Sequence, residues 1–126
     1  MVDPIRLSAV LASTDLARSQ EFYEQTVGLP LSSETVPNHL LFDSGAGTLL
    51  IYRRPAENKA DHTQVRLWSS DIDRDVHDLA ARGVVFEDYD FPMLKTVDHI
   101  ATTAGLGRSA WFKDPDGNTI ALFQAE

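Results

Sequence analysis

Cysteine and histidine, which often bind metals or act in catalysis, form no recognisable motif in this sequence. There is no cysteine, which excludes thiolate metal sites, a cysteine nucleophile and disulfides. The histidines show no i, i+4 spacing of a helical metal-binding motif, and a surface or locally hydrogen-bonded role explains each of them better. They are His39, His62, His77 and His99.

The size and charge of the chain limit the classes of protein to which it can belong. Its 126 residues suit one domain with a real core. The formal net charge of −8 argues against nucleic acid and anionic membrane partners, because both require clustered Lys and Arg. No apolar run approaches the ~20 residues of a membrane span, and no signal-peptide pattern is visible. We expect a cytoplasmic globular protein whose acidity serves solubility, or attracts cationic ligands.

The hydrophobic pattern predicts the same order of elements twice. The first round has a strand over 5–12, a helix capped by Asp15 and closed by Gly28, the start of a strand at 30–33, and strands at 39–43 and 48–52. A linker follows over 53–61. The second round has a strand over 64–68, a helix from Asp71 to Gly83, a strand at 84–86, a long loop over 88–107 and a hairpin over 110–124.

Matching residues support an internal repeat. Laying Asp15 on Asp71 matches Leu11 with Leu67, Ser13 with Ser69, Leu16 with Ile72, and Arg18 with Arg74. Laying Asp43 on Asp114 matches Thr48 with Thr119, Leu49 with Ile120, Ile51 with Leu122, and Tyr52 with Phe123. Chance is disfavoured because matches occur at both ends of the unit. We predict two βαβββ modules, each of which needs its twin to cover an apolar sheet face.

Two motifs carry a resemblance to a known family. The first helix opens with Asp-Leu-Ala-Arg-Ser-x-x-Phe-Tyr over 15–23, and the last hairpin turns through Asp-Pro-Asp-Gly-Asn over 114–118. Asp114 and Asp116 are interpreted as turn formers. With the two modules, these motifs resemble the vicinal oxygen chelate superfamily, which includes glyoxalases, bleomycin-resistance proteins and extradiol dioxygenases. The segment 89–96 resembles small bacterial members, and the resemblance covers nearly the whole chain.

The resemblance implies an α+β fold and a single domain over 1–126. Module one, about 5–53, and module two, about 63–125, would form a curled cup of mixed sheet that holds the ligand, with both helices outside. His99 is of interest because its loop would border this cup. Many members are homodimers, so we expect a homodimer here.

The resemblance also places four metal-ligand positions, which hold His, Gln or Glu in the enzymes. Here they hold Ser8, Leu50, Gln64 and Ala121. Two of these side chains cannot coordinate, serine is a poor ligand, and one glutamine does not make a catalytic site, which needs about three protein ligands. A one-residue shift of register brings in no better donors, and nothing marks Ser8 as an activated nucleophile. We therefore expect no metal and no cofactor.

Without a metal, the cup would still be a cavity. Period two places further side chains on the same strand faces. The predicted ligand-binding residues are Ser8, Leu50, Tyr52, Gln64, Arg66, Trp68, Trp111, Ala121 and Phe123. Arg6, Val10, Thr48 and Thr119 share those faces. Trp111 belongs to this set if Phe112 faces the helix. The aromatic residues suit a flat ligand, and Arg66 suits a carboxylate or phosphate.

Each residue has a plainer alternative. The aromatic side chains could fill the cup or a dimer interface. Arg66 could form an ion pair with a buried carboxylate or lie at the rim of the cup. Gln64 could be an ordinary hydrogen-bonding residue of its strand. We favour a metal-free protein that binds an aromatic or drug-like compound, with antibiotic sequestration as a role. The alternatives are a divalent-metal-dependent lyase, isomerase or dioxygenase, and an interaction module with a closed cup.

Overall fold

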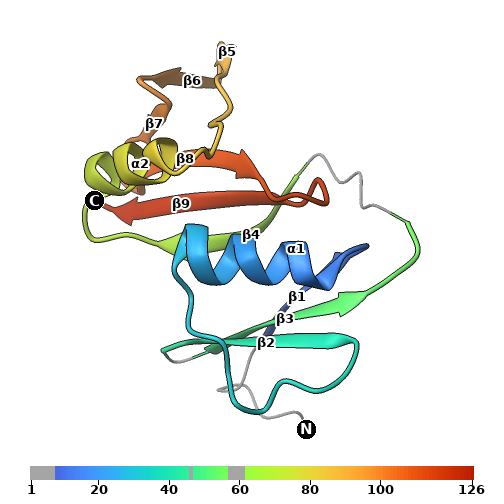
Figure 1. The fold of residues 1–126 in the computed structure, drawn as a ribbon. Helices are drawn as coiled ribbons and strands as arrows, with labels where there is room; N and C mark the ends of the chain where they lie inside the picture. The colour runs from blue at the N-terminus through green and yellow to red at the C-terminus, as the bar shows by residue number, and fades with distance from the viewer. Residues whose placement is uncertain (1–7, 46, 57–61) are drawn as a thin grey trace, which may run out of the picture. The chain divides into compact units, whose positions relative to one another are not determined.

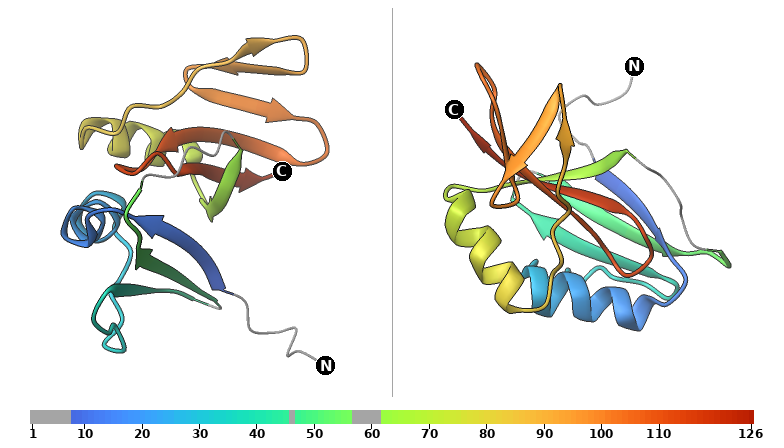
Figure 2. Two further views of the ribbon diagram at one scale, coloured as in Figure 1. Left: turned by 90° about the vertical axis from the view of Figure 1, so that its right-hand side faces the viewer. Right: turned by 90° about the horizontal axis from the view of Figure 1, so that it is seen from above.

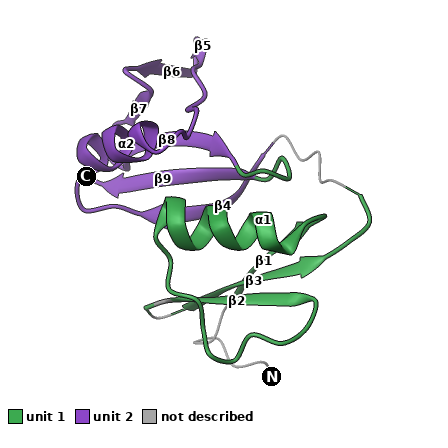
Figure 3. Cartoon of the chain, viewed as in Figure 1, with its two compact units in different colours: residues 1–59, 114–118 green, residues 60–113, 119–126 purple. Residues whose placement is uncertain are grey.

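A computed structural model describes residues 8–45, 47–56 and 62–126. The chain divides into two compact units (Figure 3). Unit 1 comprises residues 1–59 and 114–118, and unit 2 comprises residues 60–113 and 119–126. The turn that joins the last two strands therefore belongs to unit 1, although both strands belong to unit 2. The single domain and the module bounds stay predictions.

Unit 1 is a three-stranded mixed sheet with one helix (Figure 1). Its elements are β1 (Ser8–Ser13), α1 (Leu16–Gln20), η1 (Glu21–Val27), β2 (His39–Ser44) and β3 (Gly47–Arg53). The strand order is β1-β3-β2, with β1 parallel and β2 antiparallel to β3. The helix contacts β2 and β3. Between them lies a buried core that includes Tyr23, Phe42, Leu49 and Ile51.

Both predicted ends of this helix are confirmed. The Asp15 side chain accepts a hydrogen bond from the Arg18 N–H at 3.2 Å, and Gly28 adopts φ +93° at the other end. The second half, η1, is a π-helix, in which hydrogen bonds join residues five positions apart rather than the four of an α-helix. Sequence periodicity did not reveal this change, because seven residues are too few to separate the two periods.

Unit 2 is a six-stranded mixed sheet with helix α2 (Ile72–Ala81) packed against β8 and β9. Its strands are β4 (Thr63–Trp68), β5 (Asp90–Phe91), β6 (Leu94–Val97), β7 (Ile100–Thr103), β8 (Gly107–Lys113) and β9 (Thr119–Ala125). The order is β4-β9-β8-β7-β6-β5, and only β4 and β9 are parallel (Figure 2). Asp71 caps α2 through the Arg74 N–H at 3.1 Å, as predicted.

The registers confirm the repeat. Leu11 pairs with Ile51 in unit 1, and Leu67 pairs with Leu122 in unit 2, which is the match that the sequence alignment gave. The fold is α+β, built from mixed sheets and two helices, and in each unit the helix covers one sheet face. The curled cup stays a prediction. No helix within the described residues is long and apolar enough to cross a membrane.

Three details of the prediction are wrong. The strands expected at 30–33 and 84–86 are reduced to single bridges, Leu31 with Phe42 and Phe86 with Phe112. The segment 88–107 is not a long loop, because it contains β5, β6 and β7. The β6–β7 turn is made by Asp98 and His99 at φ +52° and +71°, where a sequence signal would require Asn or Gly. Residues 5–7, with Arg6, and residues 57–61 of the linker lie outside the described part.

Gly107→Ala tests the register of β8. Gly107 has φ +148°, and a Cβ there would lie 2.2 Å from the backbone oxygen of Gln124. We expect the variant to lose about 3 kcal/mol or more of unfolding free energy, because the clash is with backbone that cannot move aside. Gly105→Ala, at φ +79° in open space, is the matched control and should lose about 1 kcal/mol. Equal losses in urea denaturation would contradict this assignment.

Candidate functional site

The sheet face of unit 2 opposite α2 carries most of the predicted site. Arg66 pairs with Ala121, Ala121 pairs with Trp111, and Trp68 pairs with Phe123. Paired residues point to the same side of a sheet, so these five side chains share one face. Phe112 points the other way, where it is fully buried and packs edge-on against Phe86 at 5.6 Å. The shared face of Trp111 with this set is confirmed, and its role in binding stays a prediction.

An aromatic and cationic cluster occupies one end of this open face. The rings of Trp68 and Phe123 meet edge to face at a centroid distance of 5.1 Å. The guanidinium carbon of Arg66 lies 4.1 Å from the Phe123 centroid and 5.1 Å from that of Trp68. Phe123 is buried beneath, whereas 68% of the Trp68 surface is exposed. The outer layer thus presents an indole ring beside a positive charge.

Trp111 and Tyr89 form the other end of the face. Trp111 donates its indole N–H to the Thr63 hydroxyl at 3.0 Å, and the Tyr89 ring packs edge-on against it at 5.5 Å. Burial, together with a hydrogen bond to Glu87, raises the pKa of Tyr89 to about 12, so its phenol stays protonated at neutral pH. Sequence analysis missed Tyr89, because it assigned the segment to a loop.

The corresponding face of unit 1 is smaller and less aromatic. Ser8 pairs with Thr48 and Val10 with Leu50, so the predicted sharing of a face is confirmed there. The Ser8 and Thr48 hydroxyls are 2.5 Å apart, which occupies both polar groups. Val10 is 53% exposed and Tyr52 is 38% exposed. This face offers apolar contact area and no charged group at these five positions.

The described residues at the family's ligand positions do not suit a catalytic metal. In unit 1 these positions are Ser8, bonded to Thr48, and Leu50. In unit 2, Ala121 has no donor, and the Gln64 side-chain oxygen accepts the Thr119 N–H at 3.0 Å. Gln64 lies in a bulge, so Thr63 rather than Gln64 pairs with Thr119, whereas Ser8, the counterpart of Gln64 in unit 1, pairs directly with Thr48. Within the described ranges, no three His, Asp or Glu side chains are grouped as metal ligands.

His99 lies on the α2 side of unit 2, not among the aromatic residues of the open face. Its ring stacks on Phe86 at 5.9 Å and its Nδ1 lies 2.8 Å from an Asp88 carboxylate oxygen. It lines a shallow groove of about 440 Å³ together with α2 residues such as Val76 and Ala80. The structure accounts for this histidine as a locally hydrogen-bonded side chain.

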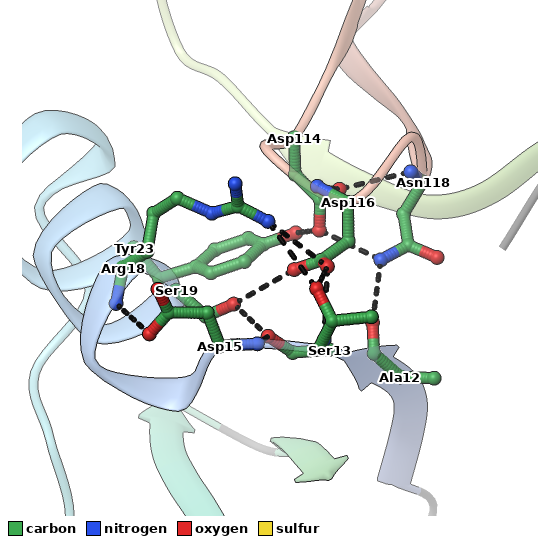
Figure 4. Close-up of polar contacts among 10 residues, drawn as sticks. Ala12, Ser13, Asp15, Arg18, Ser19, Tyr23, Asp114, Asp116 and Asn118 are labelled. Atoms are coloured by element: carbon green, nitrogen blue, oxygen red, sulfur yellow. Dashed lines mark hydrogen bonds and ion pairs between the residues drawn. The ribbon is translucent and has the colours of Figure 1, made fainter. Parts of the chain in front are cut away.

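A buried polar network in unit 1 holds the turn 114–118 (Figure 4). One Asp114 oxygen accepts the backbone N–H groups of Asp116 and Asn118, both at 2.9 Å. The other accepts the Tyr23 hydroxyl at 2.6 Å and the Asn118 side-chain amide at 2.7 Å. Burial, with the nearby charge of Asp114, raises the pKa of Tyr23 well above its usual value, so Tyr23 stays a donor.

Asp116 is the second buried carboxylate of this network. It accepts from the Thr14 N–H at 2.9 Å, the Thr14 hydroxyl at 2.7 Å, the Arg18 guanidinium at 3.1 Å and the Ser19 hydroxyl at 3.2 Å. Burial alone would raise the pKa of Asp116, but the Thr14 hydrogen bonds and the Arg18 charge outweigh it and lower that pKa. The sequence interpretation as a turn former is incomplete, because these carboxylates also bind the first helix.

The chain was compared with family profiles, with curated proteins and with solved structures. The sequence matches the family profile described as Glyoxalase/Bleomycin resistance protein/Dioxygenase superfamily over residues 6–122. No curated protein matches the chain significantly. Among solved structures, TnmS3, an antibiotic binding protein from Streptomyces sp. CB03234, is 25% identical, with a TM-score of 0.65 and coverage of 100% of this chain and 98% of that one.

Two further structures share the fold at lower identity. A superfamily member from Sphaerobacter thermophilus DSM 20745 is 21% identical, with a TM-score of 0.72 and coverage of 98% of each chain. Lactoylglutathione lyase from Agrobacterium tumefaciens is 17% identical, with a TM-score of 0.70 and coverage of 94% of this chain and 91% of that one. At these identities the likeness shows the fold alone.

Tyr23→Phe tests the buried network. The change leaves the ring in place and removes a donor to a buried carboxylate, so we expect a loss of about 2 kcal/mol in unfolding free energy. Tyr89→Phe is the matched control, since Tyr89 also donates to a carboxylate, Glu87, in a more accessible place. It should lose less than about 1 kcal/mol. Urea denaturation measures both, and a larger loss in the control would refute the central role of Asp114.

Asp116→Asn tests the charge of the network through pH. The folded pKa of Asp116 is lowered, so the unfolded chain binds the proton more readily. The carboxylate therefore stabilises the fold above its unfolded pKa of about 4, and this stabilisation is lost as pH falls through the folded pKa. The variant should be less stable at pH 7 and lose less stability on acidification. Denaturation at pH 7, 5, 4 and 3 measures this, and an unchanged pH profile would contradict it. Asp90→Asn, exposed on β5, is the control.

Proposed function

The chain belongs to the glyoxalase/bleomycin resistance protein/dioxygenase superfamily, and on that premise we propose that it is a metal-free binding protein for an aromatic or drug-like small molecule. Antibiotic sequestration is the role that this activity would serve. The ligand would lie on the open face of the unit 2 sheet. The curled cup, the homodimer and the cytoplasmic location remain predictions, and the proposal rests on this face by itself.

The observation that carries the proposal is the exposure of Trp68. A large aromatic ring with 68% of its surface accessible leaves apolar area in water, and such area gathered on one face is typical of binding sites. The edge of one ring meets the face of the other where Trp68 packs against Phe123, and the Arg66 guanidinium lies close to both rings. Trp111 and Tyr89 extend the same aromatic surface. A flat ring stacked on such a residue gains about 0.5–1.5 kcal/mol beyond area burial.

The comparison with TnmS3 supports a binding role. That protein is described as antibiotic binding and covers this chain completely at 25% identity. The lactoylglutathione lyase shares only the fold, and a fold does not determine a reaction. The enzyme alternative would also need metal ligands, and the described positions that the family uses hold Ser8, Leu50, Gln64 and Ala121. The Gln64 side-chain oxygen already accepts a hydrogen bond from the backbone N–H of Thr119. Binding without catalysis is therefore the better supported function.

Tryptophan fluorescence gives a direct test, because both tryptophans of the chain lie on the open face. We expect quenching by members of a panel of naphthalene, anthracene and acridine derivatives, with a Kd in the micromolar range. A compound at one hundred times its Kd should also raise the unfolding free energy by about 2.7 kcal/mol. Trp111→Phe leaves Trp68 as the single reporter, and its quenching should persist.

Trp68→Ala should weaken binding about five- to tenfold, because it removes the stacking surface. Leu106→Ala is the control, since Leu106 is also an exposed apolar residue, at 51%, but lies in the turn between β7 and β8, outside the residues of the proposed site. The control should bind as the wild type does. The proposal fails if no compound of the panel binds with a Kd below about 1 mM, or if the two variants lose affinity equally.

A further inference from the structure

Arg66 is held in place without a charged partner. Its guanidinium carbon lies 4.1 Å from the Phe123 ring centroid and 5.1 Å from that of Trp68. Cation–π contacts with both rings therefore position the long side chain on the aromatic surface. Within the described residues, no carboxylate lies within 4 Å of it. A guanidinium seated on rings keeps N–H donors for other groups, since aromatic carbon accepts no ordinary hydrogen bond.

Two other cations of unit 2, Lys113 and Arg108, each have a carboxylate partner. Lys113, on the same face, pairs with Glu87 at 3.3 Å and donates to the Thr119 hydroxyl at 2.5 Å. Arg108, on the α2 side, pairs with Asp73 at 2.9 Å. The positions beside Arg66 in the sheet hold Ala121 and, one strand further, Trp111, neither of which carries charge. The open face thus has an unbalanced positive charge next to an exposed indole.

We infer that the ligand class is a planar aromatic compound that carries an acidic group, with the acid bound by Arg66 and the ring stacked on Trp68. This inference rests on the proposed function and narrows it. The net charge of −8 would by itself favour a cationic ligand. A charge in direct contact outweighs that distant field, because charges more than about 8–10 Å away are screened at physiological salt. Guanidinium and carboxylate also match in geometry, with two parallel hydrogen bonds.

The test compares three probes of one size and different charge: 2-naphthoate, 2-naphthamide and 2-naphthylmethylammonium. Calorimetric titration at pH 7 and constant ionic strength should show that the carboxylate binds wild type about tenfold or more tighter than the neutral amide, and that the ammonium compound binds weakest. Equal affinities for carboxylate and amide would overturn the inference and leave the proposed function standing. Absence of binding by all three would also overturn the inference, and the wider panel described above would then decide the proposed function.

Arg66→Met separates charge from packing. The unbranched side chain can still cover Phe123, so affinity for 2-naphthamide should fall much less than affinity for 2-naphthoate, and the preference for 2-naphthoate should disappear. Arg66→Lys should keep part of the preference, since it retains a point charge without the planar fork. Arg108→Met makes the same change in net charge on the other side of the sheet and should leave the preference intact. A preference that survives Arg66→Met, or that is lost in Arg108→Met, would refute the assignment.

Discussion

Two buried carboxylates on one turn are the constraint on which the rest of this structure depends. Asp114 and Asp116 are 5% and 1% exposed, and a carboxylate that far from water is tolerated only when its oxygens are hydrogen-bonded. Both oxygens of each carboxylate are. The donors include backbone N–H groups of the turn itself and side chains about one hundred residues earlier, among them Arg18 and Tyr23. The network therefore joins the two ends of the sequence within unit 1.

This network also fixes the turn between β8 and β9, the last two strands. The turn belongs to unit 1, whereas β8 and β9, which it connects, belong to unit 2. Those two strands carry Trp111, Ala121 and Phe123 on one face, and their other face packs against α2. Because side chains alternate along a strand, fixing the turn fixes which residues face the helix and which stay open. The open face exists because the helix covers only one side of the sheet.

Charge is used in opposite ways in the two places. In the turn, Arg18 and several neutral donors balance Asp116, and no polar side-chain atom buried within the described residues lacks a hydrogen-bond partner. On the open face, Arg66 rests on aromatic rings with no described carboxylate beside it. The first arrangement stabilises the fold. The second leaves a charge exposed to solvent, where it contributes little to stability but can be neutralised by a ligand.

The sequence by itself determined the order of the elements, both helix caps, the repeat and the sharing of faces, because these follow from local periodicity and from residues such as Asp15 and Asp71. It also showed that the family's ligand positions hold Ser8, Leu50 and Ala121, which needs only a count along the repeat. It did not reveal the strands of 90–103, since Asp98 and His99 make their turn without Gly or Asn.

Only the tertiary structure decided the rest, because it depends on contacts between residues far apart in sequence. The bulge at Gln64 shifts one pairing and commits its side chain to Thr119. The burial of Asp116 and its bonds to Thr14 turn an ordinary turn residue into a centre of the fold. The contact of Arg66 with Phe123, 57 positions away, likewise results from strand pairing, which local sequence patterns do not encode.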